Sequence, residues 1–186
     1  MILPIAVIGN PVLREKAAPI GKDYPGLDKL IADMFETMYN AEGVGLAAPQ
    51  VGIPVRLFII DGTPLADEEP GLKDFKKVFI NAEISERSGD IELMSEGCLS
   101  IPNIREEVRR EDEIEISWYD QHWNHHKERY TGFIARVIQH EYDHIDGILF
   151  TDRLGSLRKK LIKRRLNEIG KGRFDVGYKT ALAGGR

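Results

Sequence analysis

Residues 133–145 read FIARVIQHEYDHI, and the rest of the chain is best interpreted outward from this stretch. Its apolar residues recur at helical spacing along two adjacent stripes, so the helix they predict is apolar around much of its circumference. Thr131 before the stretch and Gly147 after it are typical of a helix start and a helix stop. The sequence therefore predicts a central helix over 132–146.

Within this helix, His140-Glu141-Tyr142-Asp143-His144 is a His-Glu-x-x-His pattern. Residues four apart lie on one helix face, so His140 and His144 can hold a single metal ion. Glu141 can then act on a water molecule at the ion without being a ligand itself. The alternative is that the histidines are ordinary core or surface residues and that Glu141 pairs with an arginine. Burying three such polar groups without a partner is costly, which favours the metal site.

Cys98 is the candidate for a third ligand, because a catalytic site of this type needs three protein ligands and one open position. It is the single cysteine of the chain and follows Gly97 at the end of a strand-like segment. A lone cysteine is more often a small buried core residue. A thiolate nevertheless binds zinc or ferrous iron well, and the histidine pair favours that interpretation. By itself, a Cys/His/His set suggests zinc.

The remaining periodicity predicts an α+β fold of many antiparallel strands and segregated helices. Besides the central helix, it predicts helices over 26–41 and 156–169, strands over 55–60, 77–94, 104–119 and 127–130, an exposed loop over 61–75 and a hairpin turn over 121–126.

Length and composition indicate the class of protein and the number of domains. The chain has 186 residues, 42% of them apolar and 30% charged, which is typical of one globular domain. We expect a single catalytic domain over 1–170, with a loose tail over 171–186. The early apolar run over 1–9 is too short to span a bilayer and lacks the charged start of a signal peptide. We therefore expect a cytoplasmic protein without membrane contact.

Charge is distributed unevenly along the chain. The formal net charge is −4, but residues 1–152 carry a net −13 and residues 153–173 a net +8. The basic residues belong to the predicted C-terminal helix within 153–170, whose leucines and isoleucine at 157, 161, 162 and 166 would dock on the body. A solvated helix face is one interpretation of such a segment; contact with a polyanion is the other.

Three segments stand in order along the chain: GVGLAAPQ at 43–50, EGCLS at 96–100 and QHEYDH at 139–144. In their letters and spacing they closely resemble the peptide deformylase family, and the similarity runs over most of residues 1–165. The resemblance implies removal of the formyl group from the N-terminal formyl-methionine of newly synthesised polypeptides, with release of formate. It also implies an α+β fold with antiparallel sheets packed around the motif helix.

The resemblance further implies the cofactor and the partners. The family metal is ferrous iron, which zinc, nickel or cobalt can replace. The substrates are N-formyl-methionyl nascent peptides. Because such chains emerge from a ribosome, ribosomal RNA is the natural polyanion for the basic segment 153–173.

Residue roles follow by matching the family motifs. Cys98, His140 and His144 match the metal ligands, and Glu141 matches the general acid/base. Gln50 and the Leu99 backbone N–H match the donors that stabilise the oxyanion. Gly45 matches a residue whose backbone meets the substrate, with Gly43 and Gly97 beside it; Val44, Phe133, Val137 and Arg105 match the surroundings of the methionine slot.

One residue departs from the family pattern near this slot. Arg136 stands where relatives often carry an apolar side chain, and we expect it to point away from the core. The loop over 61–75 is also longer than in compact relatives.

Other functions remain open at this point. The motif also fits a metallopeptidase with a carboxylate as third ligand, a catalytically silent relative that binds ribosomes or nascent chains, or an enzyme with a cysteine nucleophile paired with histidine. Cys98, intact Glu141 and Gln50, and the effect of metal chelation are the features that separate them.

Overall fold

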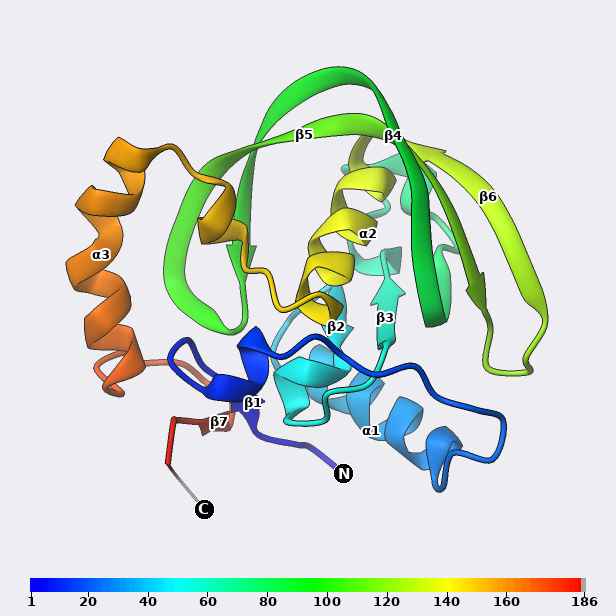
Figure 1. Ribbon diagram of the computed structural model, residues 1–186, viewed down its shortest axis with the longest axis horizontal. Helices are drawn as coiled ribbons and strands as arrows, with labels where there is room; N and C mark the ends of the chain where they lie inside the picture. The colour runs from blue at the N-terminus through cyan, green and yellow to red at the C-terminus, as the bar shows by residue number, and fades with distance from the viewer. Residues whose placement is uncertain (185–186) are drawn as a thin grey trace.

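The computed structural model describes residues 1–184, which fold into one mixed α+β body (Figure 1). This confirms the predicted fold class. The strands and helices of the described residues are β1 Ile5–Ala6, α1 Leu27–Asn40, β2 Gly45–Ala47, β3 Leu57–Asp61, β4 Lys76–Cys98, β5 Ile101–Tyr119, β6 His125–Thr131, α2 Gly132–Ile145, α3 Ser156–Gly170 and β7 Thr180–Ala181.

Five strands form an antiparallel sheet in the order β2-β3-β4-β5-β6. β4 and β5 make a long hairpin that arches over α2 (Figure 1). The ladder between them shifts register at four places. Each such irregularity bends a strand and increases its twist, which lets the hairpin curve. Cys98 pairs with Ile101, so the turn at the end of the hairpin consists of Leu99 and Ser100 alone.

α2 packs against β2, β3, β5 and β6. Ten of its 14 residues are buried, including Ala135, Ile138 and Ile145, which join a core with Phe79 and Trp118. Burying a side chain such as Ile138 stabilises the fold by about 1.5–3 kcal/mol. Thr131 precedes the helix as predicted, although its side chain makes no capping hydrogen bond.

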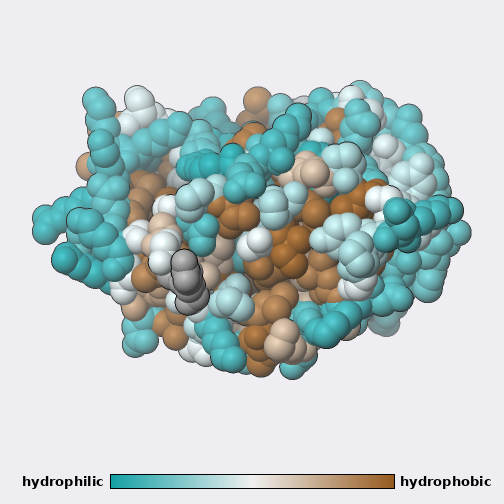
Figure 2. Space-filling view, turned by 60° about the horizontal axis from the view of Figure 1, so that its bottom comes forward, coloured by the Kyte–Doolittle hydropathy of each residue, from teal (hydrophilic) through white to brown (hydrophobic). Residues whose placement is uncertain are grey.

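α1 packs on the face of β2 and β3 that is opposite to α2. Its buried residues recur at helical spacing and face the sheet: Leu27, Leu30, Ile31, Met34 and Met38 are all 9% exposed or less. Figure 2 looks at the face where α1 and the chain ends lie, and shows apolar side chains gathered in its middle with hydrophilic ones around them. The prediction of a core-facing stripe is confirmed.

The tail is not loose along its described part. β7 pairs in parallel with β1, with a backbone hydrogen bond of 2.9 Å from the Ile5 amide to the Lys179 carbonyl and one of 3.0 Å from the Val7 amide to the Ala181 carbonyl. The expectation over 171–186 missed this because two backbone-paired residues leave no periodicity in the sequence; residues 185–186 lie outside the described part.

α3 stands at the side of the molecule (Figure 1). Only Ile162 and Ile169 are buried in it, whereas Leu157 and Leu161 are 69% and 63% exposed. The predicted docking stripe was therefore wrong at its first two leucines. The helix contacts the body through Ile162 and Ile169, and Arg158 in its first turn pairs with Glu106 of β5.

The segment over 61–75 also differs from a plain exposed loop. It contains two short 3-10 turns, Thr63–Leu65 and Pro70–Leu72, and buries Leu72 and Phe75 against the core. Among the described residues there is no helix with both the length and the apolar character needed to cross a bilayer.

Candidate metal centre

Cys98 at the end of β4 and the two histidines of α2 converge in the middle of the molecule. One ligand atom from each of Cys98, His140 and His144 lies within 4.8 Å of the other two. The Cys98 Sγ and the His144 Nε2 are 3.3 Å apart. Ligand atoms bound tetrahedrally to one zinc-sized ion lie roughly 3.4–3.8 Å apart, so the three side chains fit around a single divalent cation.

The hydrogen bonds around the cluster agree with a metal site. The His140 Nδ1 lies 3.0 Å from the Glu96 Oε2, which leaves the Nε2 of that ring for a metal. Two buried polar atoms, the Glu141 Oε2 and the His144 Nδ1, have no hydrogen-bond partner within the described structure. Unpartnered buried polar atoms are rare in folded proteins, and the free Glu141 oxygen lines the cleft beside the cluster, where a bound water or substrate could partner it.

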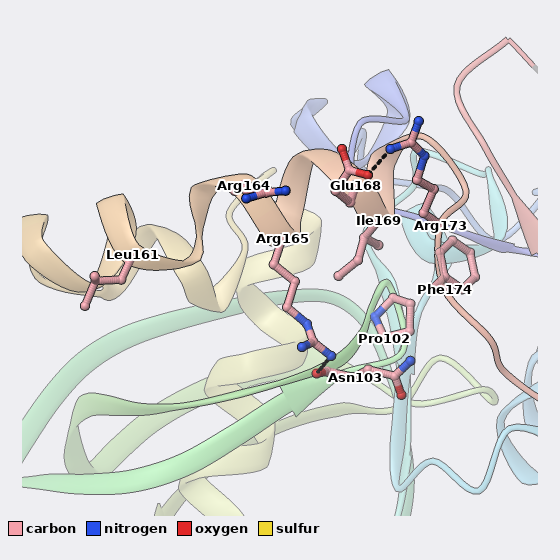
Figure 3. A pocket seen from close by; sticks show the side chains of 9 residues that line it. All are labelled: Pro102, Asn103, Leu161, Arg164, Arg165, Glu168, Ile169, Arg173 and Phe174. Atoms are coloured by element: carbon pink, nitrogen blue, oxygen red, sulfur yellow. Dashed lines mark hydrogen bonds and ion pairs between the residues drawn. The ribbon is translucent and has the colours of Figure 1, made fainter.

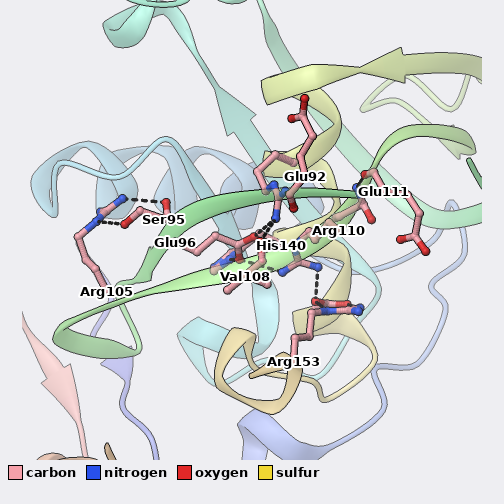
Figure 4. A network of polar contacts seen from close by, with 12 residues as sticks. Glu92, Ser95, Glu96, Arg105, Val108, Arg110, Glu111, His140 and Arg153 are labelled. Carbon is pink, nitrogen blue, oxygen red and sulfur yellow. Dashed lines mark hydrogen bonds and ion pairs between the residues drawn. The ribbon is translucent and has the colours of Figure 1, made fainter. Parts of the chain in front are cut away.

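A buried network of charges contacts His140 on the Nδ1 side of its ring, through Glu96 (Figure 4). Arg110 is the centre of it: its Nε and Nη2 donate to the two Glu96 oxygens at 2.6 and 2.9 Å, and its Nη1 donates to Asp143 at 2.7 Å. Arg153 donates to the same Asp143. Burial acts to raise the pKa of Glu96, but hydrogen bonds from Arg110 and His140 outweigh it and hold that pKa well below its usual range.

Arg136 belongs to this network, which corrects the expectation that it points away from the core. It is only 5% exposed and donates to the Glu96 Oε1 at 3.0 Å, the Val108 carbonyl at 2.9 Å and the Glu92 carbonyl at 2.9 Å. A guanidinium can be buried here because both of its terminal nitrogens donate to acceptor oxygens.

Glu141 lies on α2 directly against β2. A Cβ placed on Gly45 would come within 2.5 Å of the Glu141 Oε1, so only glycine leaves room for this carboxylate. Burial raises the pKa of Glu141 to about 7, because the charged form loses its water. By the same cause, burial lowers the pKa of His144, which keeps that imidazole neutral and able to bind a metal.

Gln50 reaches the cluster from the 3-10 turn Ala48–Val51 and is 1% exposed. Its Oε1 accepts from the Ala47 amide at 2.8 Å, and this fixes the direction of its amide group. The Nε2 then lies 3.5 Å from the Cys98 Sγ and 3.2 Å from the Ser100 Oγ. The glutamine thus presents an N–H group beside the metal ligands.

A cleft of about 700 Å³ opens onto the cluster. Every residue that the sequence analysis assigned to the substrate lines it: Gly43, Val44, Gly45, Gly97, Leu99, Arg105, Phe133 and Val137. Gly43 packs under the Leu99 side chain, where a Cβ would meet it at 2.9 Å. Arg105 is held at the rim by hydrogen bonds to the Ser95 hydroxyl and carbonyl, at 3.3 and 3.2 Å.

The cleft is also lined by residues that the sequence analysis did not single out, and four of them come from two unexpected segments. Leu65 and Glu68 come from the segment over 61–75, and Val176 and Tyr178 come from the tail. The segment over 61–75 was expected to be an exposed loop because it is rich in proline, glycine and acidic residues, and the tail was expected to be loose because it is a chain terminus. Nothing in the sequence signals that they fold back onto the cleft.

An α+β fold in which a thiolate and two imidazoles meet beside a buried glutamate defines a metal-dependent hydrolase. The pattern of the polypeptide deformylase family matches residues 2–160. The chain belongs to this family, and its activity is the metal-dependent removal of the N-formyl group from nascent peptides.

Individual relatives support this assignment over nearly the full chain. The peptide deformylase of Christiangramia forsetii is 57% identical, covering 96% of this chain and 95% of its own. That of Flavobacterium psychrophilum is 52% identical, covering 98% and 97%. The crystal structure of the peptide deformylase from Thermus thermophilus superposes with a TM-score of 0.82 at 38% identity, covering 92% of this chain and 99% of that one.

Proposed function

We propose that Cys98, His140 and His144 bind one ferrous ion, and that zinc, nickel or cobalt can replace it. The support is the donor set: one soft thiolate and two imidazoles suit all four divalent ions, and each ligand atom lies within 4.8 Å of the others. When bound there, such a cation polarises a carbonyl oxygen and makes a water molecule more acidic. The roles of the other residues follow from the chain's own groups.

Glu141 is the general acid/base of the proposed reaction. Its pKa of about 7 suits a group that must both take and give a proton near neutral pH. It takes a proton from the water that attacks the formyl carbon, and a C–O bond forms. When the C–N bond breaks, the same proton passes to the leaving nitrogen. The products are formate and the free amino terminus of the peptide.

Gln50 and the Leu99 backbone N–H stabilise the negative charge that develops on the formyl oxygen. Both are neutral donors, and the Gln50 amide is held in place by the Ala47 amide. Removing one donor of this kind costs about 10²–10³ in rate.

The cleft residues hold the peptide. Val44, Phe133 and Val137 offer an apolar slot for the methionine side chain. Gly43, Gly45 and Gly97 present their backbones to the peptide in the cleft, while the space of the missing Cβ atoms is occupied by the chain's own Leu99, Glu141 and Arg105. Arg105 at the rim faces the part of the substrate beyond the methionine. The catalytic domain of the proposed enzyme spans residues 1–170, and Val176 and Tyr178 of the tail complete the wall of its cleft.

The convergence of Cys98 with the two histidines carries this proposal, and a pair of variants tests it. We expect Glu141→Ala to keep its bound metal but to release formate from formyl-Met-Ala at least 10²-fold more slowly, since Glu141 is not a ligand. His140→Ala should lose both metal and activity. Metal analysis after anaerobic purification gives the content and the identity of the ion. Loss of metal from Glu141→Ala would contradict the assigned role.

The metallopeptidase alternative is separated by a third variant. Cys98→Asp would leave metal content and activity roughly intact if the third ligand could be a carboxylate. We expect it to weaken metal binding instead, because the shorter bond of an oxygen ligand does not match the position of the thiolate.

We also propose that α3 contacts ribosomal RNA, which would place the enzyme in the cytoplasm where nascent chains emerge. Lys159, Lys160, Lys163 and Arg164 are exposed and form no salt bridge with any described residue. A group of four unpaired cations on one helix attracts a polyanion. A pocket next to Arg164 is also lined by Arg165 and by Arg173, which pairs with Glu168 (Figure 3).

Ribosome co-sedimentation at low salt tests this contact. We expect a variant with Lys159, Lys160, Lys163 and Arg164 changed to Glu to remain in the supernatant while deformylating free peptides normally. A variant with the exposed Lys16 and Lys73 changed to Glu serves as the control for added negative charge. Equal sedimentation of all three proteins would remove the proposal.

A further inference from the structure

The turn between β4 and β5 is held more firmly than its position at the end of a hairpin requires. It consists of Leu99 and Ser100, directly after the ligand Cys98. The carbonyls of such a turn usually face water. Here the Ser100 carbonyl accepts from the Ile8 amide at 2.8 Å, and the Leu99 carbonyl accepts from the Tyr178 hydroxyl at 2.8 Å.

These two donors come from opposite ends of the described chain. Ile8 follows β1, and Tyr178 precedes β7, the strand that pairs with β1. The tail is also attached by a hydrogen bond of 3.3 Å from the Asn103 side chain to the Asp175 carbonyl. Phe174 in the same tail lies beside Pro102 and Asn103 (Figure 3). The tail therefore has a defined path from α3 to the cleft.

At the cleft, this path brings Val176 and Tyr178 into the same wall as Leu99 and Cys98. The side chains of Tyr178 and Leu99 both pack against the core that contains α1. The residue therefore has two separable parts: a ring that contributes to packing, and a hydroxyl whose hydrogen bond goes to the backbone of the turn. The family pattern ends at residue 160, so it assigns nothing to this tail.

We propose that Tyr178 is a positioning residue of the active site, whose hydroxyl fixes the peptide groups of Leu99 so that its N–H points at the developing oxyanion. This inference rests on the proposed role of the Leu99 N–H. A phenol is protonated at neutral pH and donates to the carbonyl, which restricts rotation about the Leu99 backbone. Preorganised donors are effective because they do not have to reorient as charge develops.

The position of the hydroxyl predicts which kinetic constant changes. Tyr178 acts through a donor that matters chiefly in the transition state, so its loss lowers kcat more than it alters KM. Because one neutral hydrogen bond is lost and the donor itself remains, the effect is about three- to tenfold. This is smaller than the effect of removing a donor outright.

Tyr178→Phe is the decisive variant, because it removes the hydroxyl and retains the ring. We expect kcat for formyl-Met-Ala to fall about three- to tenfold, with KM within about twofold of the unchanged protein and with unaltered metal content and melting temperature. Tyr119→Phe is the matched control. Tyr119 belongs to the edge of the same core but lies next to Trp123, away from the cleft lining.

Three outcomes would overturn the inference. A kcat within twofold of the unchanged protein shows that the hydroxyl does not position a donor. A loss of metal, or a fall in melting temperature beyond that of Tyr119→Phe, shows that it supports the ligands or the fold. Glu141→Ala is measured in parallel: if that variant retains full turnover, the proposed mechanism has failed and the inference falls with it. If only Tyr178→Phe is unaffected, the inference alone is wrong.

Discussion

The molecule contains two groups of basic side chains that differ in almost every physical respect. Inside, Arg110 and Arg136 are 2% and 5% exposed, and each points its guanidinium at fixed oxygens behind His140. Outside, the cations of α3 face solvent, and only Arg158 among them reaches a nearly buried carboxylate, that of Glu106. The inner arginines hold Glu96, and through it His140, in position. The outer cations face solvent and are available to bind a partner.

The comparison shows that the energetic role of an arginine depends on its surroundings. A buried carboxylate such as Glu96 is tolerable only while its donors remain, so removal of one donor leaves an uncompensated charge. Removing an exposed cation changes the free energy of unfolding very little, because water solvates the groups that it contacted. The next three predictions test this difference in order of effect.

Arg110→Met should have the largest effect. Glu96 and Asp143 would both lose a buried cationic partner, and we expect the free energy of unfolding to fall by about 3–5 kcal/mol. Urea denaturation followed by circular dichroism measures this. Arg129→Met is the control: Arg129 contacts three carboxylates where Arg110 contacts two, but its side chain is 47% exposed. Its urea midpoint should stay close to that of the unchanged protein, and equal losses in the two variants would refute the distinction.

Arg136→Met should have an intermediate effect. Glu96 keeps its two bonds from Arg110, but the carbonyls of Glu92 and Val108 lose their donor. We expect a loss of about 1–3 kcal/mol in the same urea experiment. Metal content should not change, because Glu96 still holds the His140 ring. A destabilisation as large as that of Arg110→Met would mean that the network has no single centre.

Lys160→Ala should have the smallest effect. The residue is exposed on α3, and substitutions at such positions change stability by no more than about 0.5 kcal/mol. Its urea midpoint and its turnover of free formyl-Met-Ala should match those of the unchanged protein. A clear shift in either would show that the helix surface contributes to the fold or the cleft.

Much of the metal centre could be predicted from the sequence, because its signals are local. His140, Glu141 and His144 lie within one helical turn, and the apolar residues around them indicate burial. Cys98 could be added only by elimination and by resemblance, since no periodicity relates residues 42 or more positions apart. The α+β class and the three helices could be predicted for the same local reason.

The parts that depend on distant pairing could not be predicted. The interior position of Arg136 depends on Glu96 and on two strand carbonyls that no pattern connects to it. The tail depends on two backbone hydrogen bonds, from Ile5 in β1 and from Val7 directly after it, and backbone hydrogen bonds carry no side-chain signature. Leu157 and Leu161 are exposed because α3 packs on the body through Ile162 and Ile169, and helical periodicity does not show which part of an apolar stripe is covered.

The parallel pairing of β1 with β7 has a consequence for biosynthesis. β7 is translated after every other described element, yet it pairs with the strand that is translated first. In a copy of the protein that is still being elongated, Cys98, His140 and His144 are all present before the tail. The hydrogen bond from the Tyr178 hydroxyl to the Leu99 carbonyl cannot form until the tail has been made. If Tyr178 has the proposed role, full turnover appears only once the tail has folded back, and copies that terminate before it should turn over at least about threefold more slowly even when their metal ligands are complete.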